Sequence, residues 1–210
     1  MTDGQGTDEG MDAREAAGIM QDARKHAEHE LQFSHPVMLA GWGVIYILAY
    51  GWLWLSVRGQ RPYQGPTGGA AGGVTILVLV GLTITAAIVA RASAGVGGLS
   101  SLQRRIYWLS LAVGFAGIYT LEAAIDHAGA SRAVIAVIAA SGPVFVAGVV
   151  YVAGTAVFRN WAVCGLGCWL VATAAGSAFA GPVAIWAVNG LAGGLGFLTA
   201  AAVSARRGRA

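Results

Sequence analysis

Long apolar stretches alternate along this chain with short polar connections. Six apolar stretches approach or exceed the length that a helix needs to cross about 30 Å of hydrocarbon. They cover Pro36–Val57, Gly72–Val89, Ile106–Ala124, Ala133–Phe158, Trp161–Gly181 and Pro182–Ala205. Each stretch is continuously apolar, whereas the strands of a membrane β-barrel alternate between apolar and polar residues. The pattern therefore predicts an all-α polytopic membrane protein with six transmembrane helices.

The first 33 residues follow a different pattern. Residues 1–10 are rich in Gly and Asp, so we expect a disordered tail there. Over residues 11–33, small and apolar side chains recur at three- and four-residue spacing opposite a charged face, which predicts a cytoplasmic amphipathic helix. The stripe available to dock a partner is formed by Ala16, Met20, Ala23 and Ala27. The six-helix domain would then occupy residues 34–205, with a basic cytoplasmic tail over residues 206–210.

Charge is scarce and unevenly placed. Of the 210 residues, 56% are hydrophobic and 11% are charged, against about 25% charged in an average soluble domain. Eight of the ten acidic residues lie in the first 30 residues, so the rest of the chain carries two acids and ten arginines. So few charges cannot cover the surface of a water-soluble fold of this size, whereas lipid accepts apolar side chains.

The positions of the basic residues predict the orientation. Ten of the thirteen Lys and Arg fall on the side that holds both termini, and only Arg58, Arg61 and Arg132 fall on the other. By the positive-inside rule, both termini are cytoplasmic. The Ala/Gly/Val/Arg bias is typical of a GC-rich bacterial genome, so we expect the bacterial inner membrane. The basic residues are spread as loop anchors rather than gathered in a patch, and we expect no nucleic-acid binding.

Two acids are candidates for chemistry inside the membrane. Glu122 and Asp126, the only acids after residue 30, are four apart and share a helix face, with His127 and Arg132 nearby. Intramembrane carboxylates are costly and usually face a cavity or a partner. Glu122 is either a proton carrier or cation ligand, or a structural hydrogen-bonding or snorkelling group. Asp126 has a simpler interpretation as an interfacial residue, with Arg132 offsetting the acids.

Polar and helix-breaking residues interrupt the later segments at similar depth. Pro143, which follows Ser141 by two residues, should free the carbonyl of Ala139 and kink its helix. Asn189 lies about two turns into the last segment, and Ser177 about one turn from the end of the fifth. Transporters build substrate sites from interrupted helices with polar groups at such depths. A lone Pro and a lone Asn are also common packing features, so a cavity and solid packing are both open.

Aromatic residues recur at four-residue spacing along the first segment, at Trp42, Tyr46, Tyr50 and Trp54. This spacing predicts an aromatic ridge on one helix face. The ridge is either a packing seam with its ends in the two interfacial belts, or one wall of a site for an apolar or cationic molecule.

Other short patterns add little chemistry. Gly190 and Gly194 form a G-x-x-x-G pattern that permits close helix approach, and we favour packing within the chain, although a homo-oligomer is also compatible with it. Cys164 and Cys168 share a helix face without a His or acid beside them, so we expect packing. The run HAEHE lacks the spacing of a zinc-protease motif. The sequence predicts no catalytic residues, no metal site and no cofactor, and therefore no enzyme.

The start of the membrane domain carries a resemblance. The run EAAGIMQDARKHAEHEL followed by HPVMLAGWGVIYILAYGWLWLSV is similar to small multi-helix integral membrane proteins of unknown function from high-GC Gram-positive bacteria. The matching residues are His35, Pro36, Gly41, Trp42, Gly43, Gly51, Trp52, Trp54 and Ser56. Genes of this kind often lie beside one for a small winged-helix regulator, so the resemblance implies a partner and gives no catalytic residues to carry over.

Two functions are compatible with these patterns. The first is a non-enzymatic membrane component of a small regulatory or stress-response unit, in which the helix over residues 11–33 docks a cytoplasmic or membrane protein. The alternative is a transporter or permease subunit with an outward-facing site around Glu122, Pro143 and Asn189.

Overall fold

The computed structural model describes Gly18 and residues 36–92, 99–158 and 161–207. The helices are α2 (Pro36–Val57), α3 (Gly68–Ala92), α4 (Leu99–His127), α5 (Arg132–Phe158), α6 (Trp161–Ser177), α7 (Ala184–Val188), the π-helical turn η1 (Asn189–Gly193) and α8 (Gly194–Arg207). Over the described ranges the structure contains helices and turns but no strand. The all-α prediction is therefore confirmed. The chain separates into the units Met1–Gln32 and Phe33–Ala210, and all helices α2 to α8 belong to the second.

Five helices are long and apolar enough to cross a membrane: Pro36–Val57, Gly68–Arg91, Arg105–His127, Arg132–Ala156 and Ala184–Arg206. The remaining apolar helix, α6, has 17 residues, and at 1.5 Å per residue its length of about 25 Å is a little less than the hydrocarbon core. The structure is thus that of a multi-pass membrane protein with five helices of spanning length. The predicted sixth crossing rests on a helix shorter than a typical span.

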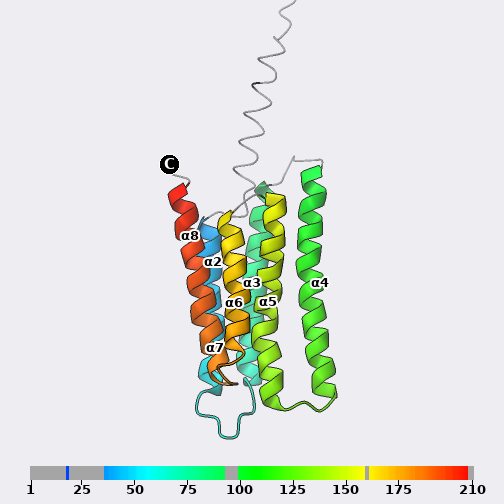
Figure 1. The fold of residues 1–210 in the computed structure, drawn as a ribbon, viewed down its shortest axis with the longest axis vertical. Helices are drawn as coiled ribbons and strands as arrows, with labels where there is room; N and C mark the ends of the chain where they lie inside the picture. Colours follow the sequence, from blue (N-terminus) through cyan, green and yellow to red (C-terminus); the bar gives the residue numbers. More distant parts are fainter. Residues whose placement is uncertain (1–17, 19–35, 93–98, 159–160, 208–210) are drawn as a thin grey trace, which may run out of the picture. The chain divides into compact units, whose positions relative to one another are not determined.

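Consecutive helices of this unit run in opposite directions (Figure 1). The connections over residues 58–67, 128–131 and 178–183 lie together at one end of the bundle, and the start of α2 and the end of α8 lie at the other. Loops that join antiparallel neighbours must lie on alternate sides, so this arrangement follows directly from the order of apolar segments along the chain.

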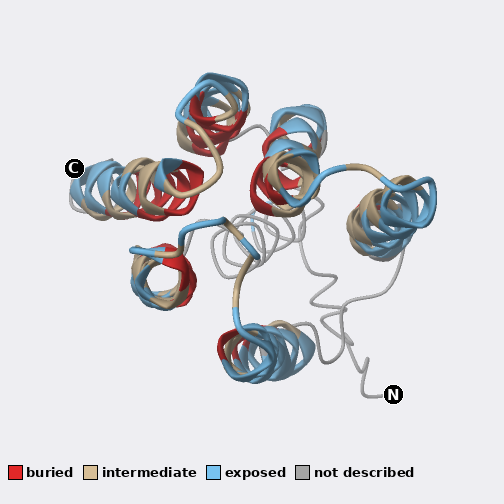
Figure 2. Cartoon of the chain, turned by 90° about the horizontal axis from the view of Figure 1, so that it is seen from below, coloured by how far each residue is buried: buried red, intermediate tan, exposed pale blue. Residues whose placement is uncertain are grey.

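Four elements form the core of the bundle: α2, α5, α6 and the last helix, which comprises α7, η1 and α8. We call them the core helices. Their buried residues face one another, as Figure 2 shows. Glycines set the closest approaches: a Cβ added at Gly167 would lie 2.7 Å from the carbonyl oxygen of Gly148, and one at Gly43 would lie 3.1 Å from that of Gly194. Close packing of this kind, rather than burial away from water, holds helices together in lipid.

The outer helices, α3 and α4, each pack mainly against one neighbour, α3 against α2 and α4 against α5. Most of their residues are exposed (Figure 2), and many of the exposed side chains are large and apolar. Ile76 on α3 is 64% exposed and Leu109 on α4 is 62% exposed. Apolar surface on this scale is rare on soluble monomers, and it fits contact with the lipid bilayer.

Two predicted helix starts are too late. α3 begins at Gly68 rather than Gly72, so the connection before it ends at Thr67. The Thr67 hydroxyl accepts a hydrogen bond from the backbone N–H of Ala70 at 3.3 Å, and its carbonyl accepts one from that of Ala71 at 2.9 Å. This N-terminal cap offsets the low helix propensity of the glycines. α4 extends beyond the predicted Ile106–Ala124 at both ends, because helical hydrogen bonds continue past the apolar stretch.

The turn between α6 and α7 is longer than expected. α6 ends at Ser177 rather than Gly181, which places Ser177 at the end of the helix and not one turn inside it. Gly181 has φ of +83°, a conformation that glycine adopts readily, and its carbonyl accepts the N–H of Ile185 at 3.0 Å. The last helix therefore begins at Ala184, and Pro182 lies in the turn instead of at the first helical position.

The predicted amphipathic helix over residues 11–33 lies outside the described residues except for Gly18, which is helical and exposed. The docking stripe of Ala16, Met20, Ala23 and Ala27 lies outside them too, as does the predicted tail over residues 1–10. The final basic segment begins inside α8, because Arg206 and Arg207 continue the helix.

Candidate functional site

Three polar side chains from different parts of the sequence meet inside the bundle. Ser141 on α5, Ser177 at the end of α6 and Asn189 at the start of η1 form what we call the Ser–Asn cluster. The Ser141 and Ser177 hydroxyl oxygens are 3.1 Å apart, and the Ser177 hydroxyl is 3.2 Å from Oδ1 of Asn189. Ser177 is 1% exposed and Asn189 is 0% exposed. The cluster is therefore sealed in the core of the bundle.

Asn189 is left with an unpaired polar atom. Its Nδ2 is buried and has no hydrogen-bond partner among the described residues. More than nine in ten buried polar groups in proteins are paired, so a wholly buried amide nitrogen without a partner is unusual. Leaving such a donor unpaired costs about 1–3 kcal/mol. The Ser–Asn cluster is thus the part of the described core where a hydrogen-bonding group is most clearly in excess.

The backbone is irregular around this cluster. The last helix passes through the π-helical turn η1 at Asn189–Gly193, where the helix is wound more loosely. The indole Nε1 of Trp169 donates a hydrogen bond of 2.7 Å to the carbonyl of Ala192 within this turn. Gly190 and Gly193 let the turn lie against α2, since a Cβ at either would fall 2.7 Å from Tyr50 or Tyr46. A Cβ at Gly194 would likewise meet Ile47 of α2, so both glycines of the G-x-x-x-G pattern, Gly190 and Gly194, pack within the chain.

Pro143 lies two residues from Ser141, but α5 continues through it as one helix from Arg132 to Phe158. The proline therefore does not end the helix, but it removes one backbone N–H, which leaves the carbonyl of Ala139 without its helical donor. The adjacent carbonyl of Ala140 accepts a buried hydrogen bond of 2.9 Å from the hydroxyl of Tyr50. Side-chain donors commonly support the backbone around a proline in a membrane helix.

The four aromatic residues of the first segment have different neighbours. Trp42 donates a hydrogen bond of 3.1 Å from Nε1 to the Thr85 hydroxyl on α3. The rings of Tyr46 and Tyr50 lie 5.0 Å apart, and Tyr46 packs against Phe197 of α8 at 5.3 Å. Trp54 lies under the Arg58 guanidinium, 5.6 Å from its centre. Four residues are slightly more than one helical turn, so side chains at this spacing point in gradually different directions. The four aromatic residues therefore take part in three separate contacts of α2: with α3, with α8 and with Arg58.

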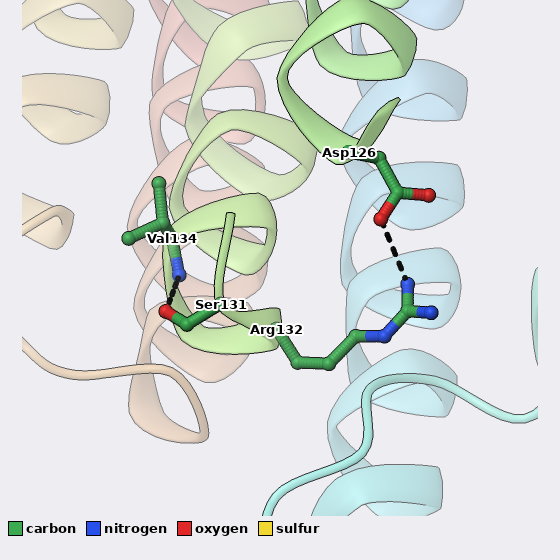
Figure 3. Close-up of polar contacts among 4 residues, drawn as sticks. All are labelled: Asp126, Ser131, Arg132 and Val134. Atoms are coloured by element: carbon green, nitrogen blue, oxygen red, sulfur yellow. Dashed lines mark hydrogen bonds and ion pairs between the residues drawn. The ribbon is translucent and has the colours of Figure 1, made fainter. Parts of the chain in front are cut away.

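Glu122 and Asp126 lie on the outer helix α4. Asp126 forms an exposed ion pair of 3.3 Å with Arg132, which is drawn in Figure 3. The nearby Ser131 hydroxyl accepts a hydrogen bond from the backbone N–H of Val134 at 3.4 Å and caps α5. Glu122 is half-buried, and no described residue forms a hydrogen bond or ion pair with it. α4 packs against α5. The structure brings Asn189 near the region of Pro143, but no hydrogen bond or ion pair joins Glu122 to the Ser–Asn cluster.

The connection over residues 58–67 is tied to the last helix. Trp186 donates a hydrogen bond of 3.1 Å from Nε1 to the Tyr63 hydroxyl. Burial raises the pKa of Tyr63 above its ordinary value, and this outweighs the opposite effect of the Trp186 N–H. Gln60 orders the same connection by donating to the carbonyls of Ser56 and Gly65, each at 3.0 Å.

The two cysteines are free thiols, Cys164 partly buried and Cys168 exposed. Within the described ranges, no three His, Cys, Asp or Glu side chains gather closely enough to hold a metal ion.

Some residues of this region were not among the sequence-based site candidates. Ser141 and Ser177 were visible only as isolated polar interruptions, and their distance of 36 residues along the chain gave no sign that they meet. Tyr63 and Trp186 are 123 residues apart and carried no signal at all.

Comparison with known proteins gives no match: no protein-family model, no curated protein and no solved structure matches this chain. The resemblance drawn from the first membrane segment therefore stays a prediction.

Proposed function

We propose that this chain is a non-enzymatic, multi-pass protein of the bacterial cytoplasmic membrane that acts as a transporter or permease subunit, with its site at the Ser–Asn cluster. The observation that carries the proposal is the amide nitrogen of Asn189, which is wholly buried within a helix of spanning length and has no partner among the described residues. Polar side chains are retained inside membranes where they serve a substrate path or a partner.

The backbone around the cluster supports the same function. Transporter sites are formed where membrane helices are interrupted and polar groups become available at the interruption. Here the π-helical turn begins at Asn189 itself, and Pro143 withdraws a backbone donor two residues from Ser141. Both irregularities occur in core helices that pack tightly elsewhere, which favours a role for this region beyond packing.

The distribution of basic residues supports an orientation with both termini in the cytoplasm. Arg58, Arg61 and Arg132 lie at the end of the bundle opposite the start of α2 and the end of α8. Since positive charge accumulates on the cytoplasmic side, this less basic end faces outward. Ser177, at the end of α6 that points the same way, then places the Ser–Asn cluster in the outward-facing half of the bundle.

The proposal is tested by solute flux into proteoliposomes that contain the full chain. We expect water, or at least one solute from a panel of potassium, ammonium, acetate, glycerol and acetamide, to cross the membrane faster than in protein-free vesicles. N189L, which keeps the branched shape and the number of side-chain heavy atoms but removes the amide, should abolish that difference. Rates equal to those of protein-free vesicles for water and for every solute would overturn the proposal. E122Q is measured beside it, because a loss equal to that of N189L would add Glu122 to the path.

A second function rests on the amphipathic pattern of residues 11–33, with its stripe of Ala16, Met20, Ala23 and Ala27. We propose that this helix docks a cytoplasmic or membrane protein, in line with the resemblance to membrane proteins encoded beside a regulator. A stripe made mostly of alanine buries little area and needs a partner surface to stay docked. A partner recovered from native membranes with the full chain should be lost with A16E/A23E. Recovery of the same partner with both forms would contradict docking.

A further inference from the structure

We infer that the Ser–Asn cluster recognises a small uncharged molecule through a group that accepts a hydrogen bond from Asn189, such as a carbonyl, a hydroxyl or water. This inference rests on the proposed function and specifies the chemical class of its solute. Three properties of the cluster lead to it: the number of protons available, the absence of nearby charge in the described core, and the way the cluster is closed.

The proton count shows what the cluster lacks. The Ser177 hydroxyl has one hydrogen but lies within bonding distance of three acceptors, the carbonyl of Ala174 at 3.0 Å, Oδ1 of Asn189 at 3.2 Å and the hydroxyl of Ser141 at 3.1 Å. If Ser177 donates to Asn189, both N–H groups of the Asn189 amide are free. If Ser177 donates to Ala174 instead, the amide can turn and donate one N–H to Ser177, and its second N–H is still free.

Either orientation of the amide therefore leaves at least one buried donor without an acceptor. In the turned orientation the amide oxygen is also free. A ligand that can both accept and donate a hydrogen bond can therefore bind the Asn189 amide in either orientation. The Tyr50 hydroxyl does not meet this demand: it donates to the carbonyl of Ala140 at 2.9 Å and forms no hydrogen bond with the Asn189 Nδ2, which has no partner among the described residues. What completes the cluster is an acceptor from outside the described side chains.

The absence of charge near the cluster excludes ions as the preferred ligand. Among the described residues of α5, α6 and η1, only Arg132 is charged, and it lies nine residues before Ser141, or about 13 Å along the helix. Arg132 is also paired with Asp126 at the surface. A buried ion without an opposite charge loses several kcal/mol of hydration that neutral dipoles recover only in part. A neutral molecule needs no such compensation.

The cluster is also closed, which limits the ligand to a small size. Asn189 is 0% exposed, and Trp186, one turn before it, packs against Tyr50 with ring centres 6.1 Å apart. The Trp186 indole is held by Tyr63 of the 58–67 connection. A ligand can reach Asn189 only when these side chains move, so molecules of a few heavy atoms fit the site better than large ones.

The experiment compares neutral and ionic probes in the same proteoliposomes. Stopped-flow light scattering follows water efflux and then the entry of glycerol or acetamide, and fluorescent indicators follow potassium and acetate. We expect glycerol or acetamide entry, water efflux, or both to be accelerated by the protein and to return to the protein-free rate in N189L. Potassium and acetate should enter at the protein-free rate in both forms. The water and solute phases are measured separately, so they distinguish a path for water from one for neutral solutes.

Two further variants keep the test decisive. S177A removes the hydroxyl that holds Asn189 but no bulk, so it should lower the neutral flux even if N189L does not fold. T85V is the matched control, because Thr85 is a buried hydroxyl on α3 that bonds Trp42 away from the cluster. It should leave the flux unchanged. If N189L and S177A abolish potassium or acetate flux and spare neutral flux, the transporter remains and the inferred ligand class is wrong. If no probe of either kind depends on the protein, the proposed function itself fails.

Discussion

The core helices and the outer helices of this protein are both apolar, but they differ in how closely they pack against other helices. α5, α6, α2 and the last helix bury small residues against one another and bring backbones together at Gly148 and Gly167. α3 and α4 are also apolar enough to cross a membrane, but each packs mainly against one neighbour and exposes most of its side chains. The difference shows that apolar character alone does not place a membrane helix in a core. Small residues at facing positions do, because lipid gives helices no hydrophobic reason to associate.

Polar groups follow the same division. On α4, the hydroxyls of Ser110 and Thr120 bond to carbonyls of their own helix, at Ile106 and Ala116. In the core, Ser141, Ser177 and Asn189 depend on one another across helices. These two hydroxyls of α4 are therefore satisfied within their own helix, whereas the Ser–Asn cluster is connected by hydrogen bonds that only the tertiary structure provides.

The largest effect is expected from one added methyl group. G167A should destabilise the protein by about 3 kcal/mol, since overpacking a tight core site costs this order of energy and the new Cβ would lie 2.7 Å from the carbonyl oxygen of Gly148. G117A on α4 meets nothing within 4 Å and should stabilise by up to about 1 kcal/mol through higher helix propensity. Thermal unfolding in detergent measures both. Equal destabilisation by the two variants would contradict the conclusion that the core helices are closely packed and the outer helices are not.

The next largest effect concerns a hydroxyl. S177A should cost about 2 kcal/mol, because it leaves buried partners on Ser141 and Asn189 without their hydrogen bond. S110A is its match on α4 and should change stability by less than about 0.5 kcal/mol, as surface substitutions usually do. The same unfolding assay compares them. A neutral S177A would mean that the cluster is not held together through Ser177.

A smaller difference is expected between two tyrosines. Y50F removes the buried donor to the carbonyl of Ala140 beside Pro143 and should cost about 1 kcal/mol. Y119F on α4 alters a residue that is 54% exposed and should cost close to nothing. Unfolding midpoints of the two variants, measured in one detergent, give the difference. A cost for Y119F as large as for Y50F would indicate that α4 is part of the core.

The smallest effect belongs to the ion pair between Asp126 and Arg132 at the end of α4 and α5. Its side chains are well exposed, so D126N should lower stability by less than about 0.5 kcal/mol. The difference should disappear in high salt, where exposed charges are screened. Melting curves at low and high ionic strength test this. A large loss of stability that persists in high salt would indicate that the ion pair is shielded from solvent, and the nearby Glu122 would then be the next residue to substitute.

The apolar pattern predicted the helices well. α2 occupies Pro36–Val57 as expected, because this stretch is bounded by a proline and by polar residues. Helix ends at turns were predicted less well. Thr67 and Ser177 act through hydrogen bonds to backbone groups a few residues away, so the apolar pattern contains no trace of them. A few residues of α3 and α6 were therefore misassigned.

The candidate site was predicted in part. Asn189 and Pro143 stood out because an amide and a proline are conspicuous inside apolar helices. Their relation to Ser141 and Ser177 could not be predicted, since it depends on the rotation of three helices about their axes and on the π-helical turn. Glu122 stood out equally, yet it lies on an outer helix and forms no bond with the cluster.

The sequence by itself determined three properties of this protein: that it is apolar enough for a bilayer, which of its segments form helices, and at which end of these helices its basic residues are concentrated. These properties depend on composition summed over long stretches, where each residue adds its own transfer energy. Only the tertiary structure decided which helices form the core and which polar groups meet there. Those outcomes depend on single glycines and on helix rotation, where one residue of register changes which side chain faces inward.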